Sequence, residues 1–157
     1  MKKNLRRVVL GVLSLAFIFI ITGCGSKKAL TPSAFKSKME NKGYVVQDGT
    51  SQFAAYDYVK QVYIAQNSDA QYQIEFYELS DADTTTSFFE NNKADFEISK
   101  GSSDVETAVT LGNYSKYTLS TGGQFKVVSR IDNTVVYLDV ADTYEKTVKD
   151  VLKNLGY

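Results

Sequence analysis

Residues 124–140 read QFKVVSRIDNTVVYLDV, and this stretch decides the fold class. Two runs rich in valine and other strand-forming residues, 124–131 and 134–140, flank the pair Asp132-Asn133. Such residues favour strands, and a two-residue Asp-Asn loop tolerates the positive φ angles of a tight hairpin turn. The stretch therefore predicts an antiparallel β-hairpin.

The sequence on the N-terminal side predicts further strands of the same kind. Gly122-Gly123 predicts a second tight turn directly before the hairpin. Residues 72–77 alternate apolar or aromatic with polar side chains, the period of two that marks a half-buried strand. Together these signals predict strands over 44–47, 58–65, 71–79, 105–111 and 114–120 in addition to the hairpin.

Three helices are predicted from the residues at their ends. Thr31-Pro32 places a capping threonine before a first-turn proline, and Gly43 ends that helix. Ser80, with an acid three residues later, resembles a capping box for a helix that runs to about Ile98. Asp142 begins the third helix in the same way, and its apolar face is made of Tyr144, Val148, Val151, Leu152 and Leu155.

These elements predict a single α+β domain, an antiparallel sheet with about three helices packed on one face. The helices are too few to serve as the crossovers of a parallel sheet. A hairpin followed by a capped helix occurs twice, over 58–98 and over 124–155. This recurrence fits either an internal duplication or the ordinary way in which a strand leads into a capped helix.

The composition excludes several classes of chemistry. The 157-residue chain has no His, one Cys and no Trp, so it cannot form a Ser-His-Asp triad, a Cys-His dyad, a Cys/His zinc site or an intramolecular disulfide. Residues 1–23 carry four cations and no acid in a chain of zero formal net charge, which leaves −4 for the remainder. A net negative domain lacks the positive surface of nucleic-acid-binding proteins, and no nucleic-acid partner is expected.

Residues 1–23 are predicted to be a secretory signal peptide. A basic segment, 1–7, precedes the apolar run VVLGVLSLAFIFII at 8–21, and small residues follow. A membrane-spanning helix is the alternative, but such a helix needs about 20 apolar residues to cross the hydrocarbon core. The length of the run therefore favours a cleaved signal.

The signal ends in Ile21-Thr22-Gly23-Cys24, which resembles the lipobox of bacterial lipoproteins. This resemblance covers about the first 25 residues, and it implies that the Cys24 thiol receives a diacylglyceryl group and becomes the first residue of the mature chain. Two long acyl chains anchor a protein stably, so the resemblance implies a place on the outer face of the cytoplasmic membrane. The layout is similar to that of small lipoproteins of unassigned function from low-GC Gram-positive bacteria.

Beyond Cys24 the sequence predicts a lipidated tether and one extracytoplasmic domain. Residues 24–31 contain Gly, Ser and two adjacent lysines without apolar periodicity, and they span at most about 28 Å. Lys27 and Lys28 either keep this tether solvated or contact anionic headgroups. Residues 32–157 then form the domain.

Acidic residues supply the remaining candidates for chemistry. Asp81-Ala82-Asp83 resembles the start of a calcium loop, but Asn92 occupies the position of the final Glu ligand, so helix capping is the favoured interpretation. Carboxylate pairs such as Glu75 with Glu78 could act as acid and base on a glycan, although their spacing in sequence sets no distance in space. We assign no catalytic residue, no metal ligand and no cofactor.

The candidate binding residues come from the tyrosines. The chain has eleven Tyr, and period-two counting places several of them with charged residues on the sheet face opposite the helices. Tyrosine offers a large contact area and a hydroxyl at low entropy cost, although Tyr and charged pairs also stabilise an exposed sheet by themselves. The candidates for ligand or partner binding are Tyr63, Glu75, Tyr77, Lys126, Arg130, Tyr137 and Asp139.

Three functional hypotheses follow from these features. The favoured one is a membrane-anchored, non-catalytic binding or adaptor module of the cell envelope, whose partner is an envelope protein or a glycan. The second is an inhibitor or accessory subunit of a membrane complex, which would need an exposed apolar patch. The third is a small envelope hydrolase that uses carboxylates, which would need a cleft holding a carboxyl of raised pKa.

Overall fold

A computed structural model describes residues 26–157, so the predicted signal peptide and Cys24 lie outside the described range. The helices are α1 (Pro32–Glu40), α2 (Ala82–Ile98) and α3 (Glu145–Leu155), with 3-10 turns η1 (Thr50–Phe53) and η2 (Asp142–Tyr144). The strands are β1 (Val45–Asp48), β2 (Val59–Gln66), β3 (Gln73–Leu79), β4 (Val105–Leu111), β5 (Tyr114–Thr121), β6 (Gln124–Ile131) and β7 (Thr134–Ala141).

The strands form one sheet in the order β1-β2-β3-β7-β6-β5-β4. All neighbouring strands are antiparallel, and the contact between β3 and β7 joins an N-terminal group of three strands to a C-terminal group of four. Glu75 of β3 pairs with Tyr137 of β7, and Phe76 pairs with Val136. The predicted α+β class, with an antiparallel sheet and three helices, is confirmed.

Local sequence signals explain most turns and helix starts. Gly122 and Gly123 both have positive φ, and Asp132 adopts φ 51°, as the predicted tight turns require. The Thr31 hydroxyl accepts a hydrogen bond from the N–H of Ala34 at the start of α1. The start of α2 differs from expectation by one residue, because Asp81 rather than Ser80 has the extended backbone of a cap and accepts the N–H of Thr84.

Helix α3 also begins differently from the prediction. The 3-10 turn η2 occupies residues 142–144, and no side chain caps the helix that starts at Glu145. The expected capping box at Asp142 is therefore absent. Gly156 ends the helix in the left-handed conformation that favours glycine, as its position in the sequence suggests.

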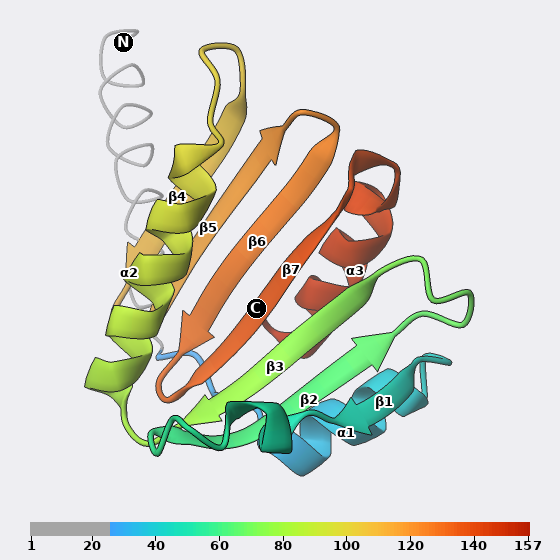
Figure 1. The fold of residues 1–157 in the computed structure, drawn as a ribbon, viewed down its shortest axis with the longest axis vertical. Helices are drawn as coiled ribbons and strands as arrows, with labels where there is room; N and C mark the ends of the chain where they lie inside the picture. Colours follow the sequence, from blue (N-terminus) through green and yellow to red (C-terminus); the bar gives the residue numbers. More distant parts are fainter. Residues whose placement is uncertain (1–25) are drawn as a thin grey trace, which may run out of the picture.

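Helices α1 and α3 cover one face of the sheet, here called the back face. Phe35 and Met39 of α1 and Val148 and Leu152 of α3 are fully buried there, and Phe35 stacks on Phe76 with ring centroids 4.7 Å apart. Burying a side chain of this size contributes about 2 kcal/mol to folding, so this layer forms the main core. Figure 1 shows both helices behind the sheet.

Helix α2 covers the opposite face, here called the front face, which corrects the expectation that all three helices pack on one face. Phe96 of α2 packs in a second core that includes Val128 and Val135 (Figure 1). Their sequence neighbours Val127 and Val136 belong to the back core, and all four valines are fully buried. Both sides of β6 and β7 are therefore covered around these valines, which explains why the two sequences run apolar there without strict alternation.

The two hairpin and helix units are not copies related by a rotation. Because β3 and β7 are antiparallel neighbours, a two-fold axis that exchanged them would run perpendicular to the sheet and would keep both following helices on one face. Instead α2 lies on the front face and α3 on the back face. The recurrence in the sequence is better explained by strands that lead into helices.

Most of the predicted tether belongs to the folded domain. Ala29 and Leu30 pack against the back core, and Thr31 caps α1. Lys27 is hydrogen-bonded to Asn113 in the turn between β4 and β5. A solvated segment as far as residue 31 was expected, but the chain follows the domain surface from Lys27 onward.

Candidate binding site

Six of the seven predicted binding residues lie on the front face. Antiparallel partners point to the same side of a sheet, so the pairing of Lys126 with Asp139 and of Glu75 with Tyr137 places these four together. The remaining two members, Tyr77 and Arg130, also belong to this face.

Tyr63 lies on the back face, contrary to the prediction. It pairs with Phe76, and its ring contacts the back core, with the Nζ of Lys36 5.9 Å from the ring centroid. The loop between β2 and β3 has six residues, whose turn is held by the Asn67 side chain accepting the N–H groups of Gln71 and Tyr72. Counting from strand to strand across such a loop does not determine the register, and a slip by one residue exchanges the faces.

Part of the front face is closed by α2 and η1. Tyr77 is only 5% exposed, because Phe53 and Phe88 pack against its ring at centroid distances of 5.4 and 5.1 Å. Arg130 is half-buried, and its Nε is buried without a hydrogen-bond partner in the described structure. Tyr77 therefore belongs to the core layer beneath the helix, whereas Arg130 is partly exposed.

The rest of the front face borders a hollow of about 370 Å³. The hollow lies at the end of the sheet that carries the β2–β3 hairpin. Figure 1 shows that α2 crosses the front of the sheet away from this hairpin. Its walls combine amide, carboxylate and phenol groups with a nearly equal share of apolar surface. The lining residues are Gln66, Ala70, Gln71, Tyr72, Gln73, Glu75, Tyr137, Leu138 and Asp139.

The carboxylate of Glu75 is held in place by two neighbours on β3. The Tyr77 hydroxyl donates a short hydrogen bond to Oε2, and the Gln73 amide donates to Oε1 at 2.7 Å. Burial and the Glu75 charge raise the pKa of Tyr77, so its hydroxyl stays protonated and continues to donate. Glu75 is therefore a fixed negative acceptor at the wall of the hollow.

Asp139 is paired with Lys126 on the neighbouring strand. The two charged atoms lie 2.9 Å apart, and the lysine Nζ is also 5.4 Å from the ring centroid of Phe96 on α2. The pair is partly exposed, so it contributes at most about 1 kcal/mol to stability. Its larger effect is to neutralise one of the two carboxylates that line the hollow.

The Tyr137 hydroxyl is the polar group best placed to meet a ligand. Its ring packs on Phe96 at a centroid distance of 5.3 Å, and the described residues offer its hydroxyl no hydrogen bond. Burial raises the pKa of Tyr137 to about 12, with smaller contributions from the charges of Asp139, Glu75 and Asp95. A neutral phenol beside carboxylates can donate one hydrogen bond and accept another.

A second hollow, of about 340 Å³, lies on the back side of the same hairpin. Tyr44 and Tyr72 join hydroxyl to hydroxyl at 2.6 Å, and Tyr72 packs on Tyr144 at a centroid distance of 4.7 Å. Tyr72 lines both hollows. The sequence alone does not reveal this cluster, because its members come from the segments before β1, β3 and α3 and no spacing along the chain links them.

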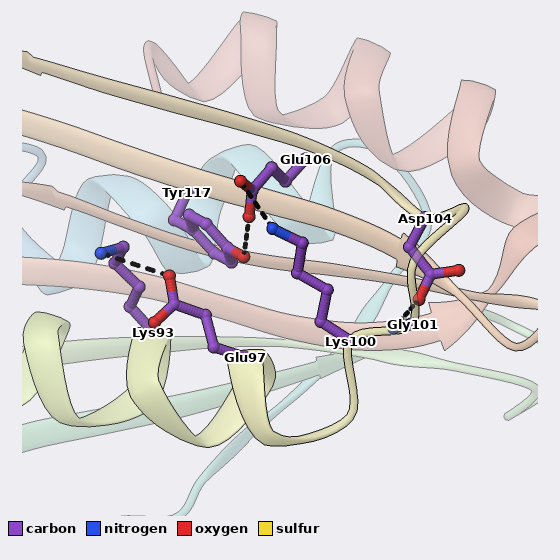
Figure 2. A network of polar contacts seen from close by, with 7 residues as sticks. All are labelled: Lys93, Glu97, Lys100, Gly101, Asp104, Glu106 and Tyr117. Carbon is purple, nitrogen blue, oxygen red and sulfur yellow. Dashed lines mark hydrogen bonds and ion pairs between the residues drawn. The ribbon is translucent and has the colours of Figure 1, made fainter.

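Another polar cluster joins the end of α2 to the edge strand β4 (Figure 2). The Glu106 carboxylate binds the Lys100 ammonium at 2.7 Å and accepts the Tyr117 hydroxyl at 2.8 Å. Lys93 pairs with Glu97 on α2 at 3.4 Å, and Asp104 accepts the N–H of Gly101 at 2.7 Å. Each of these groups has a partner within the cluster, so we interpret the cluster as structural.

Comparisons with known proteins identify no relative of this chain, so the candidate site is described from its geometry alone. No protein-family model, no curated protein and no solved structure matches the chain. Within residues 26–157, no helix is long and apolar enough to span a membrane. The same range holds no group of three or more His, Cys, Asp or Glu arranged to bind a metal ion.

Proposed function

We propose that this protein is a membrane-anchored, extracytoplasmic lipoprotein whose domain is a non-catalytic binding module for a glycan of the cell envelope. The lipobox-like sequence ending at Cys24 supports the anchor. The single observation that carries the binding role is Tyr137, which lines the front hollow and whose half-buried hydroxyl has no hydrogen-bond partner in the described chain.

The groups around Tyr137 match the chemistry of sugar hydroxyls. Glu75 and Asp139 accept hydrogen bonds, whereas the amides of Gln66 and Gln71 both donate and accept them. A glycan presents many hydroxyls of both kinds in a small volume, and a hollow of about 370 Å³ falls within the usual size range of small-molecule sites.

A titration of the purified lipidated protein with a graded series of soluble chito-oligosaccharides tests the binding role. Tyr137→Phe removes one hydroxyl and should weaken binding by about tenfold, the equivalent of one well-placed hydrogen bond. Tyr63→Phe is the matched control, because it removes the same group on the back face, and it should leave the affinity unchanged. Equal affinities for the two variants, or no binding by the unmodified protein, would remove support for this site.

The anchor needs a separate measurement. Mass spectrometry of the N-terminal peptide from membranes should show a diacylglyceryl group on Cys24. A Cys24→Ala variant should lose this modification and leave the membrane fraction. Recovery of an unmodified Cys24 in the mature chain would contradict the anchor without affecting the glycan titration.

The edge strand β4 favours a second candidate, an accessory subunit of a membrane complex. Val105, Val109 and Leu111 are 67%, 44% and 55% exposed, and β4 offers one free edge of backbone groups. A partner could add a strand there. In-cell crosslinking should then capture one envelope protein, with capture lost in Val109→Lys and retained in Val45→Lys, which alters the opposite edge strand.

A further inference from the structure

The segment before α1 is attached to one end of the domain through Lys27. Its backbone N–H donates to the Asn113 side chain at 3.0 Å, and Asn113 in turn donates to the Lys27 carbonyl at 2.7 Å. The Lys27 ammonium donates to the Gly156 carbonyl at 2.8 Å and lies 3.6 Å from the ring centroid of Tyr114. Four contacts therefore hold both the backbone and the side chain of one residue.

Asn113 connects this segment to a second turn. Its amide also donates to Asp132, in the turn between β6 and β7, at 2.9 Å. Lys27 thus lies where two hairpin turns and the C-terminal end of α3 meet, and we call this region the anchor end of the domain. Figure 1 shows the blue segment before α1 passing the β6–β7 turn.

Both hollows lie at the opposite end of the sheet. The front hollow is lined by the ends of the β2–β3 hairpin and the back hollow by the same hairpin and the start of α3. Strands β6 and β7 run between the two ends with eight residues each, which corresponds to roughly 27 Å. Tyr72, at the β2–β3 hairpin, is thus separated from Lys27 by about the length of the sheet, whereas Tyr137 lies near the middle of β7.

The chain between the predicted lipid and this attachment is very short. Cys24 precedes Lys27 by three residues, and three Cα steps of about 3.8 Å span at most about 11 Å. A domain that is held this close to the bilayer, through both the backbone and the side chain of Lys27, has little freedom to rotate relative to the membrane. We propose that Lys27 orients the domain with its anchor end against the bilayer and both hollows facing away from it.

This orientation rests on the proposed lipid anchor and adds the side from which the ligand arrives. A hollow that faces away from the bilayer can bind a soluble or cell-wall ligand but cannot reach a lipid headgroup. The experiment therefore has to separate three cases, which are an absent anchor, an anchored domain that turns freely, and an anchored domain with a fixed orientation.

Energy transfer from the protein to the membrane surface distinguishes these cases. Lipidated full-length protein is purified from membranes and placed in phosphatidylcholine vesicles that contain a headgroup-labelled acceptor lipid. Acylation blocks Cys24, the only cysteine of the chain, so a dye can be attached through Lys153→Cys at the anchor end or through Ser68→Cys at the hairpin end. Both side chains are exposed.

Transfer should be at least about threefold more efficient from position 153 than from position 68, because roughly 27 Å of sheet separates the two ends. Asn113→Ala removes both hydrogen bonds to the Lys27 backbone and should narrow the difference between the two values. Asn41→Ala, which changes an exposed asparagine elsewhere, should leave the difference intact. If Asn113 and Asn41 are unchanged and transfer is equal from both positions, or stronger from position 68, the proposed orientation is wrong. Protein that does not associate with the vesicles at all contradicts the anchor instead.

Discussion

The hydroxyl of Tyr117 on β5 donates a hydrogen bond of 2.8 Å to Oε2 of Glu106 on the edge strand β4. Lys100, just beyond α2, binds the other carboxylate oxygen at 2.7 Å (Figure 2). Through these contacts the three residues connect the C-terminal end of α2 to strands β4 and β5. Burial and the Glu106 charge raise the pKa of Tyr117, which keeps the hydroxyl a donor.

Tyr117→Phe should therefore lower the free energy of unfolding by about 1 kcal/mol, the usual net contribution of such a hydrogen bond. Urea unfolding followed by circular dichroism measures the change. Tyr56→Phe serves as the control, because Tyr56 is 50% exposed and should show no loss. An unchanged midpoint for Tyr117→Phe would mean that the Glu106 contact does not contribute.

Acid should destabilise the protein in part through Asp81. The N–H of Thr84 and the hydroxyls of Ser80 and Thr84 hold the pKa of Asp81 below its usual value. The unfolded chain then binds a proton more readily than the folded one, so this stabilisation is present above the ordinary carboxyl pKa of about 4 and is lost as pH falls through the lower, folded value. Asp81→Ala should lower Tm at neutral pH and reduce the further loss on acidification.

The neighbouring Asp83 supplies the comparison for that experiment. It lies in the first turn of α2 and is exposed, but it is not the cap. Asp83→Ala should change Tm less than Asp81→Ala does at neutral pH. A larger loss in Asp83→Ala would contradict the assignment of the cap.

Alkali should destabilise the protein through its buried tyrosines. Burial is the main cause that raises the pKa of Tyr137 and of Tyr157 to about 12. Between pH 10 and 12 the unfolded chain loses these protons and the folded chain retains them, so the free energy of unfolding falls as pH rises through this window. An absorbance titration should show Tyr137 and Tyr157 ionising only above the ordinary tyrosine pKa of about 10, or on unfolding.

Arg130 should prove dispensable for stability. Its buried Nε has no partner in the described structure, and an unpaired polar atom in the interior costs desolvation energy. Arg130→Met keeps the length of the apolar stem, so the free energy of unfolding should stay the same or rise by up to about 1 kcal/mol. Lys126→Met, which breaks a real ion pair on the same strand, should be the less stable of the two in urea.

Much of the secondary structure could be predicted from the sequence because its signals are local. The turn pairs Gly122-Gly123 and Asp132-Asn133 set their hairpins, and every predicted strand appears within two residues of its expected bounds. The face of α2 was missed, although the paired valines at 127–128 and 135–136 carried a signal for it. Consecutive buried residues in one strand require a cover on both sides of the sheet.

The candidate site was predicted only in part, because only the alternation of side chains within one strand is a local signal. Period-two counting within β3, β6 and β7 is reliable because side chains alternate along a strand, and it correctly grouped Glu75 with Tyr137 and Lys126 with Asp139. It failed for Tyr63, where a six-residue loop separates the counted strands. The Tyr44, Tyr72 and Tyr144 cluster could not be found by any count within one segment.

By itself, the sequence determined the fold class, the tight turns and the excluded chemistries, since each depends on residue type or on neighbours along the chain, and it predicts a lipid anchor at Cys24. Only the tertiary structure decided which face α2 covers, where the two hollows lie and how Lys27 is attached to Asn113. Those features depend on strand order and register. They arise from contacts between residues far apart in the chain, whose formation local propensities do not specify.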